Sequence, residues 1–149
     1  MTKKAVIISG FPGVGKTYYT QNADLNILDS DSSKFSWIKE GVRNTSFPKN
    51  YIEHIRKNID KVDVILVSSH KVVRDALVDN GIHFILVYPD RSLKEEYIKR
   101  FQDRGSNSNF INMIDKNWNS FIDDIENSDE YKTIKLESGK FLNDLLNNE

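Results

Sequence analysis

The chain has 149 residues, which suits one α/β domain with a single modest core. Its 21 basic and 22 acidic residues give a net charge of −1, which argues against a broad nucleic-acid-binding surface. The sequence contains no cysteine, which excludes disulfide bonds, thiolate catalysis and a cysteine-based zinc site, and it has no apolar run near the ~18 residues of a transmembrane helix. With no signal-peptide pattern at the N-terminus, we expect a soluble cytoplasmic protein.

The first half of the chain alternates apolar runs with helix-like patterns. Ala5–Ile8 is a continuous apolar run typical of a strand buried on both faces, and a short helix is expected from about Lys16 to Asn22. Leu25–Leu28 predicts a weaker second strand that ends at Asp29. Residues 31–47 are polar with scattered aromatic residues and indicate no single structure. From Pro48 we expect a helix, because apolar residues recur at helical spacing and proline suits a first turn.

The sequence pattern predicts the third and fourth strands and the helices beside them more clearly than the second strand. Val64–Val67 predicts a strand, and a helix follows from about Lys71 to Asn80, ending at Gly81. His83–Tyr88 predicts the fourth strand, ended by Pro89. Ser92 and Glu95 have the spacing of a capping box, which would open the next helix.

That helix is expected to reach Arg104 and to stop at Gly105. The polar segment Gly105–Asn109 is predicted to be flexible, and a long amphipathic helix follows over Ile111–Ile125. Tyr131–Leu136 predicts a fifth strand, and Phe141–Leu146 a last short helix. Strands that alternate with helices predict a single α/β domain whose parallel sheet is covered on both faces.

A glycine-rich motif lies between the first strand and the first helix. Its residues are Gly10, Phe11, Pro12, Gly13, Val14, Gly15, Lys16 and Thr17. This is the complete P-loop pattern in its required context, in which backbone N–H groups and a helix N-terminus surround the phosphates of ATP or a close relative. Lys16 would supply charge to the terminal phosphates and Thr17 a ligand for Mg²⁺. The alternative is a glycine turn that matches by chance.

Two aspartates follow the second strand. Asp29 and Asp31 would lie at the carboxyl edge of a parallel sheet, where ligands bind, with Asp29 near Mg²⁺ and Asp31 near the phosphoryl acceptor. Either residue could instead cap a helix starting near Ser32. Many P-loop proteins also carry an aspartate after the third strand, but here Ser68 and Ser69 stand there, which weakens a motor-type ATPase interpretation.

Basic residues beyond the third strand are further candidates. Arg100 and Arg104 lie one helical turn apart, lean toward the apolar stripe of their helix and precede the polar segment, so we expect them to neutralise charge during phosphoryl transfer. For Arg100 the alternative is an ion pair with Glu96. His70 and Arg74 begin a helix at the ligand edge, although a structural histidine and a surface ion pair of Arg74 with Asp75 or Asp79 are equally ordinary.

With these motifs in order, the chain resembles the nucleoside-monophosphate-kinase-like group of P-loop kinases, which includes shikimate and gluconate kinases. The segment Leu28–Asp31 is similar to the Asp-x-Asp segment of shikimate kinases, and Arg100-x-x-x-Arg104-Gly105 stands where the family has its lid arginines. Small nucleotide kinases of bacteriophages are also similar. The resemblance implies a five-stranded parallel sheet in the order 2-3-1-4-5, a lid at about residues 100–110, and ATP with Mg²⁺.

The acceptor is left open by this resemblance. The adenylate-kinase segment Asp-Gly-Phe-Pro-Arg is absent after the third strand, which puts AMP in doubt, and residues 32–60 would form the acceptor region. There Phe35 and Trp37 could stack on a base, with Lys34 or Arg43 at its phosphate, or the aromatic residues could belong to the core.

Three functions follow from these features. The first is a kinase that moves the γ-phosphoryl group of ATP to a nucleotide or nucleoside, with Lys16, Asp31, Arg100 and Arg104 as catalytic residues. The second is a kinase of another metabolite or of a nucleic-acid 5′ end. The third is a nucleotide-dependent regulatory module with little turnover.

Overall fold

The computed structural model describes residues 5–15, 26–30, 37–39, 42–43 and 46–142. The predicted helix over residues 16–22 and most of the predicted C-terminal helix lie outside these ranges. Three predicted site residues, Lys16, Thr17 and Asp31, also lie outside them. So do Lys34 and Phe35, and the side chains of Trp37 and Arg43 are not described.

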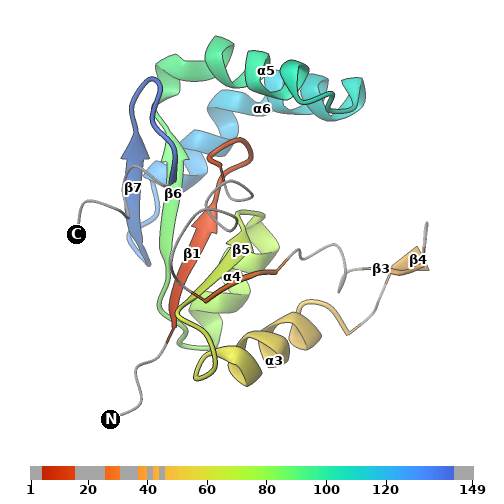
Figure 1. Cartoon of the computed structure of the whole chain (residues 1–149), viewed down its shortest axis with the longest axis vertical. Helices are drawn as coiled ribbons and strands as arrows, with labels where there is room; N and C mark the ends of the chain where they lie inside the picture. The colour runs from red at the N-terminus through yellow and green to blue at the C-terminus, as the bar shows by residue number, and fades with distance from the viewer. Residues whose placement is uncertain (1–4, 16–25, 31–36, 40–41, 44–45, 143–149) are drawn as a thin grey trace.

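Five parallel strands form the main sheet, in the spatial order β2-β5-β1-β6-β7. This order confirms the predicted α/β class and the 2-3-1-4-5 arrangement of the sheet strands. Figure 1 shows the strands pointing toward the end of the molecule where α5 and α6 lie. The strands are β1 (Val6–Gly10), β2 (Ile27–Asp29), β5 (Val64–Ser68), β6 (Ile85–Pro89) and β7 (Lys132–Leu136).

The helices fall close to the predicted ranges. They are α3 (Lys49–Asn58), α4 (Lys71–Asp79), the 3₁₀ turn η1 (Arg91–Leu93), α5 (Lys94–Asp103) and α6 (Ser108–Glu126). Gly81 and Gly105 have φ values of +68° and +75°, so each adopts the left-handed conformation that commonly ends a helix. A small antiparallel hairpin, β3 (Trp37–Lys39) and β4 (Val42–Arg43), lies apart from the main sheet (Figure 1), and the sequence pattern did not predict it.

Two predicted helix starts differ from the structure. The capping box at Ser92 is wrong, because Ser92 is inside η1 and the capping side chain is Asp90, which accepts from the Ser92 backbone N–H at 3.0 Å and from its hydroxyl at 2.8 Å. The polar segment after Gly105 is also shorter than expected. Helix α6 begins at Ser108, where the Asn107 side chain accepts from the Asn109 backbone N–H at 2.7 Å. The connection between α5 and α6 therefore covers residues 104–107, and its closure over a nucleotide stays a prediction.

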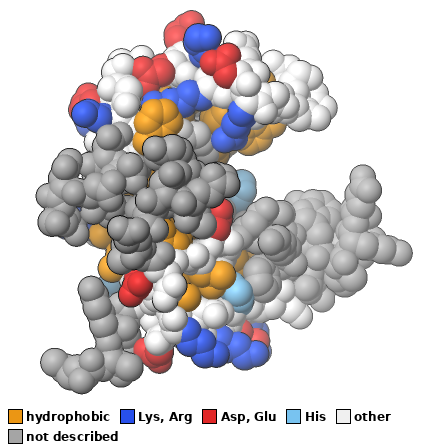
Figure 2. Space-filling model, viewed as in Figure 1, with side chains coloured by type: hydrophobic (Ala, Val, Ile, Leu, Met, Phe, Trp, Pro, Cys, Tyr) orange, Lys and Arg blue, Asp and Glu red, His pale blue; other side chains and the backbone are white. Residues whose placement is uncertain are grey.

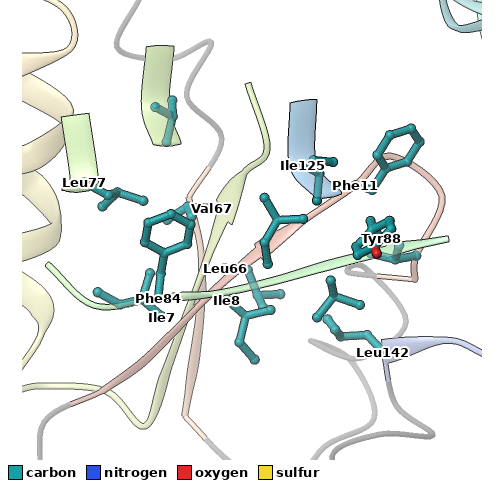
Figure 3. Close-up of a cluster of buried hydrophobic side chains, with 14 of the residues drawn as sticks. Ile7, Ile8, Phe11, Leu66, Val67, Leu77, Phe84, Tyr88, Ile125 and Leu142 are labelled. Atoms are coloured by element: carbon teal, nitrogen blue, oxygen red, sulfur yellow. The ribbon is translucent and has the colours of Figure 1, made fainter. Parts of the chain in front are cut away.

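The core lies on both sides of the three central strands, β1, β5 and β6. These strands are nearly continuous runs of Val, Ile and Leu, because helices cover a parallel sheet on both faces. Figure 3 shows side chains from all three among the buried cluster. Aromatic rings extend this core toward the carboxyl end of the sheet, where Phe11 and Trp118 meet edge to face with ring centroids 5.5 Å apart. The Trp118 indole also donates to the Arg91 carbonyl at 2.9 Å, which joins α6 to η1.

This architecture brings distant parts of the chain to one edge. In the sheet register Gly10 lies beside Ser68, and Asp29 lies beside Leu66 two residues earlier on β5. The loop after β1, the end of β2 and the end of β5 therefore share the carboxyl edge of the sheet, where open α/β sheets bind ligands. Among the described residues, no helix is long and apolar enough to cross a bilayer.

Candidate functional site

A cavity of about 780 Å³ opens at the carboxyl edge of the sheet. Its walls come from the loop after β1, the ends of β2 and β5, the end of α5, the start of α6 and the segment after β7. Figure 2 shows acidic and basic side chains at the end of the molecule where α5 and α6 lie. The lining residues are Gly10, Pro12, Gly13, Gly15, Asp29, Ser30, Ser68, Ser69, His70, Arg100, Asp103, Arg104, Phe110 and Phe141. The volume is within the range of small-molecule sites.

Two glycines of the glycine-rich loop, residues 10–15, adopt the left-handed backbone conformation. Gly13 has φ +88° and Gly15 has φ +93°, conformations that L side chains rarely adopt. The N–H groups of Phe11 and Val14 are used inside the fold, donating to the Val87 carbonyl at 2.9 Å and to the Phe11 carbonyl at 3.3 Å. Within the described part of the chain, the N–H groups of Gly13 and Gly15 find no acceptor. They are the loop donors that remain for a ligand in the cavity.

Helix α5 lies directly against this loop. A Cβ built on Gly13 would stand 3.0 Å from ring carbons of both Tyr97 and Phe101, and one built on Gly15 would stand 3.0 Å from the Phe141 ring. Tyr97 is fully buried, its hydroxyl has no hydrogen-bond partner among the described residues, and burial raises its pKa to about 12. Glycine is therefore required here for close packing as well as for its backbone angles.

Arg100 joins the loop to two other segments. One Nη group donates to the Gly13 carbonyl at 2.8 Å, and the other donates to Glu96 at 3.0 Å and to the Lys140 carbonyl at 3.3 Å. The guanidinium also lies 4.2 Å from the Tyr97 ring centroid and 3.9 Å from that of Phe141. The ion pair with Glu96, which was the alternative expected from the sequence, is present. Arg100 is thus engaged within the protein on both faces and at both Nη groups.

Glu96 extends this network to the segment after β7. Its carboxylate accepts from the Ser138 hydroxyl at 2.6 Å and from the Gly139 N–H at 3.1 Å. These two hydrogen bonds, followed by the charge of Arg100, hold the pKa of Glu96 below its usual value. No local sequence pattern indicates these partners, because they lie more than forty residues away along the chain.

Arg104 is in a different situation. Its guanidinium lies 5.0 Å from the Phe101 ring centroid, and its Nε donates to the Ser106 hydroxyl at 3.0 Å. Partial burial of the guanidinium lowers the pKa of Arg104. Among the residues that the structure describes, Arg104 forms no ion pair with a carboxylate. Arg104 lines the cavity, where its charge can bind an anion. This agrees with the expectation from helical spacing that Arg104 leans toward the protein body.

Asp29 is the exposed carboxylate at the end of β2, and it lines the cavity. The residue after it is buried and anchored by α3. The Ser30 hydroxyl lies 2.9 Å from His54 Nε2, and the Tyr51 hydroxyl donates to the Ser30 carbonyl at 2.6 Å. Burial, and then the charge of Lys57, lower the pKa of His54, so its neutral form is favoured. The chain is therefore held firmly where it leaves Asp29 toward Asp31.

The carboxylates that line the cavity suit a cation that is also coordinated by a bound anion. In the described ranges, no group of three or more His, Asp or Glu side chains could hold a metal ion alone. Asp103 also lines the cavity, but Lys99 pairs with it at 3.3 Å. Asp29 remains as a hard oxygen ligand, which fits Mg²⁺ bound through few carboxylates and through phosphate oxygens. Thr17, the other predicted ligand, lies outside the described residues.

The two candidate residues at the start of α4, His70 and Arg74, have different surroundings. Arg74 is buried and makes two hydrogen bonds within the fold. Its Nε donates to the Ser69 carbonyl at 2.8 Å and one Nη donates to the Tyr131 hydroxyl at 2.9 Å. The expected surface pairing with Asp75 or Asp79 is wrong, since Asp75 pairs with Lys71 and the carboxylate near Arg74 is Asp124 at 3.9 Å. His70 precedes α4 and lines the cavity beside Ser68 and Ser69.

Comparison with known proteins adds little. No protein-family model and no curated protein matches the chain. Among solved structures, the chain is similar to an uncharacterized protein from Eubacterium ventriosum ATCC 27560, with 15% sequence identity, a TM-score of 0.46, and coverage of 93% of this chain and 92% of that one. At that distance the likeness carries no argument about function.

The packing of Gly13 on α5 yields a stability prediction with a matched control. Gly13→Ala and Gly105→Ala both force alanine into the left-handed region, which costs about 1–2 kcal/mol. At Gly105 nothing lies within 4 Å of the added Cβ, whereas at Gly13 two rings stand at 3.0 Å. We expect Gly13→Ala to lower the free energy of unfolding by at least about 1 kcal/mol more than Gly105→Ala, through overpacking. Denaturant unfolding of both variants checks this, and equal losses would contradict the packing.

Proposed function

We propose that this protein is a small kinase that transfers the γ-phosphoryl group of ATP to a nucleotide or nucleoside. One observation carries the proposal: a single cavity gathers the unused N–H groups of the glycine-rich loop, the Asp29 carboxylate and the Arg104 guanidinium. Phosphoryl transfer needs these parts, because it depends on positioning and on neutralising charge around the phosphate oxygens.

The loop would hold the phosphates of the donor. The N–H groups of Gly13 and Gly15 supply donors, and Lys16 and Thr17 follow directly in the sequence with the charge and hydroxyl of the P-loop pattern. Asp29 and Thr17 are the residues that would hold Mg²⁺, whose charge would offset that of the phosphate oxygens. The absence of a carboxylate at Ser68 and Ser69 leaves this task to the end of β2.

Asp31 would act on the acceptor. An oxygen of the acceptor attacks the γ-phosphorus, and the bond between that phosphorus and the bridging oxygen breaks, so that ADP leaves. For a hydroxyl acceptor the proton passes to the Asp31 carboxylate. A phosphate acceptor needs no proton removal, so Asp31 would then only orient it. The residue before Asp31, Ser30, is held by hydrogen bonds with Tyr51 and His54.

The two arginines have separate roles in this proposal. Arg100 is a positioning residue, because its contacts with Gly13, Glu96 and Lys140 hold the loop, α5 and the segment after β7 together. Arg104 is the residue that contacts phosphate, because it lines the cavity without a carboxylate partner among the described residues. Charge contacts of this kind act mainly on the transition state.

Incubation with ATP, Mg²⁺ and a panel of nucleosides, nucleotides and polyols, with ADP formation as the readout, tests the proposal. We expect acceptor-dependent ADP formation with a nucleoside or nucleotide. Lys16→Ala should reduce it on the order of 10²-fold or more, since a charge at the terminal phosphates is lost, while the unfolding transition stays unchanged. ADP formation with polyols alone would indicate a different metabolite kinase. Slow hydrolysis that is independent of any acceptor would favour a regulatory module.

Arg104 gives a second, more local prediction. Arg104→Ala should lower kcat by about 10²–10³-fold with a much smaller change in ATP affinity, because the contact acts on developing charge. The melting temperature of the free protein should barely move. Lys116→Ala, at an exposed basic residue of α6 that does not line the cavity, is the control and should keep kcat. A large loss of stability with near-normal kcat would show that Arg104 is structural.

A further inference from the structure

A second cavity, of about 320 Å³, adjoins the first. It lies between the start of α4 and one side of α6, with Phe11 also in its wall. Pro12, Ser69, His70 and Phe110 line both cavities, so the two spaces meet beside the glycine-rich loop. Nothing in the proposed handling of ATP uses this second space.

The walls of the second cavity are mainly apolar. Phe110, Met113 and Phe121 of α6 line it without being fully buried, and Met113 is 39% exposed. Apolar and aromatic walls that water can reach are typical of a site for a flat, poorly hydrated group. A polyol would leave its hydroxyl groups without partners against such walls, which costs binding free energy.

One side of the same cavity is polar, and two of its charged groups are not hydrogen-bonded to each other. Arg74 and Asp124 both line it, with Nη2 and the carboxylate oxygen 3.9 Å apart, which is longer than a hydrogen bond. The other donors of Arg74 are used by Ser69 and Tyr131. A donor and an acceptor therefore stand side by side, and the edge of a nucleobase offers an acceptor beside a donor in the complementary order.

We propose that this second cavity binds the heteroaromatic base of the phosphoryl acceptor. The base packs against Phe110, Met113 and Phe121, with its polar edge at Arg74 and Asp124. The sugar or phosphate end of the acceptor then reaches the junction at Ser69 and His70 and faces the first cavity. This inference rests on the proposed function, and it makes the acceptor a nucleoside or nucleotide while excluding sugar-like alcohols. It also places the base between α4 and α6, instead of against Phe35 and Trp37, which the sequence offered as stacking residues.

The position of Met113 provides a direct test. The chain contains two methionines, Met1 and Met113, so protein labelled with ¹³C at the methionine methyl groups gives one signal from the cavity and one internal control. The protein is first saturated with ADP and Mg²⁺. The four common deoxynucleosides, their 5′-monophosphates and sorbitol are then added separately. We expect at least one nucleoside or nucleotide to shift the Met113 signal saturably by its ring current, with no shift of Met1 and none by sorbitol.

The outcomes separate this inference from the kinase proposal. A compound that is phosphorylated without moving the Met113 signal would leave the kinase standing and overturn the base site. A saturable shift without acceptor-dependent ADP formation would support the base site and overturn the kinase. The base site is also overturned if no compound shifts Met113, or if sorbitol shifts it equally.

A matched pair of variants tests the site without the label. Met113→Glu places a charge against the bound base and should weaken nucleoside binding by at least about tenfold, measured by calorimetry with ADP and Mg²⁺ present. Asn112→Glu makes the same charge change at the neighbouring exposed residue, which lines neither cavity, and should leave binding unchanged. Equal affinities for the two variants would overturn the base site.

Discussion

The close contact between the glycine-rich loop and α5 is the constraint on which the site depends. Gly13 has no room for a Cβ against Tyr97 and Phe101, and Arg100 fixes the same residue by its carbonyl. The Gly13 carbonyl accepts from Arg100, and the Gly13 N–H has no acceptor among the described residues. The loop that carries these donors is therefore held by contacts with a helix residue that is 87 positions away in the sequence.

The same helix couples three parts of the site. Glu96 holds Ser138 and Gly139, Arg100 holds the Lys140 carbonyl, and Phe141 packs over both Arg100 and Gly15. A displacement of the segment after β7 would therefore shift the glycine-rich loop, because Glu96, Arg100 and Phe141 connect the two. Arg104, one turn further along α5, is outside this network and keeps its charge available to the cavity.

The sequence predicted the features that depend on local patterns. The apolar runs located the five strands, and the glycine spacing, Asp29 and Arg104 were expected at the edge where the structure places them. Local patterns did not predict the features that depend on contacts between residues far apart in the chain. For Arg74 the sequence offered a ligand contact or a surface ion pair, and it did not indicate the hydrogen bond to Tyr131, which is 57 residues away. The anchoring of Ser30 by α3 and the second cavity between α4 and α6 likewise have no signature in local spacing.

The central claim is that the N–H groups of Gly13 and Gly15 bind phosphate. Backbone amide spectra of ¹⁵N-labelled protein during titration with ADP and Mg²⁺ test it most directly, with adenosine as the control that lacks phosphates. The account predicts that ADP moves the Gly13 and Gly15 amide protons downfield, as new hydrogen bonds to anionic oxygens form, and that adenosine does not. Unchanged Gly13 and Gly15 signals at saturating ADP, or the same shifts with adenosine, would contradict it.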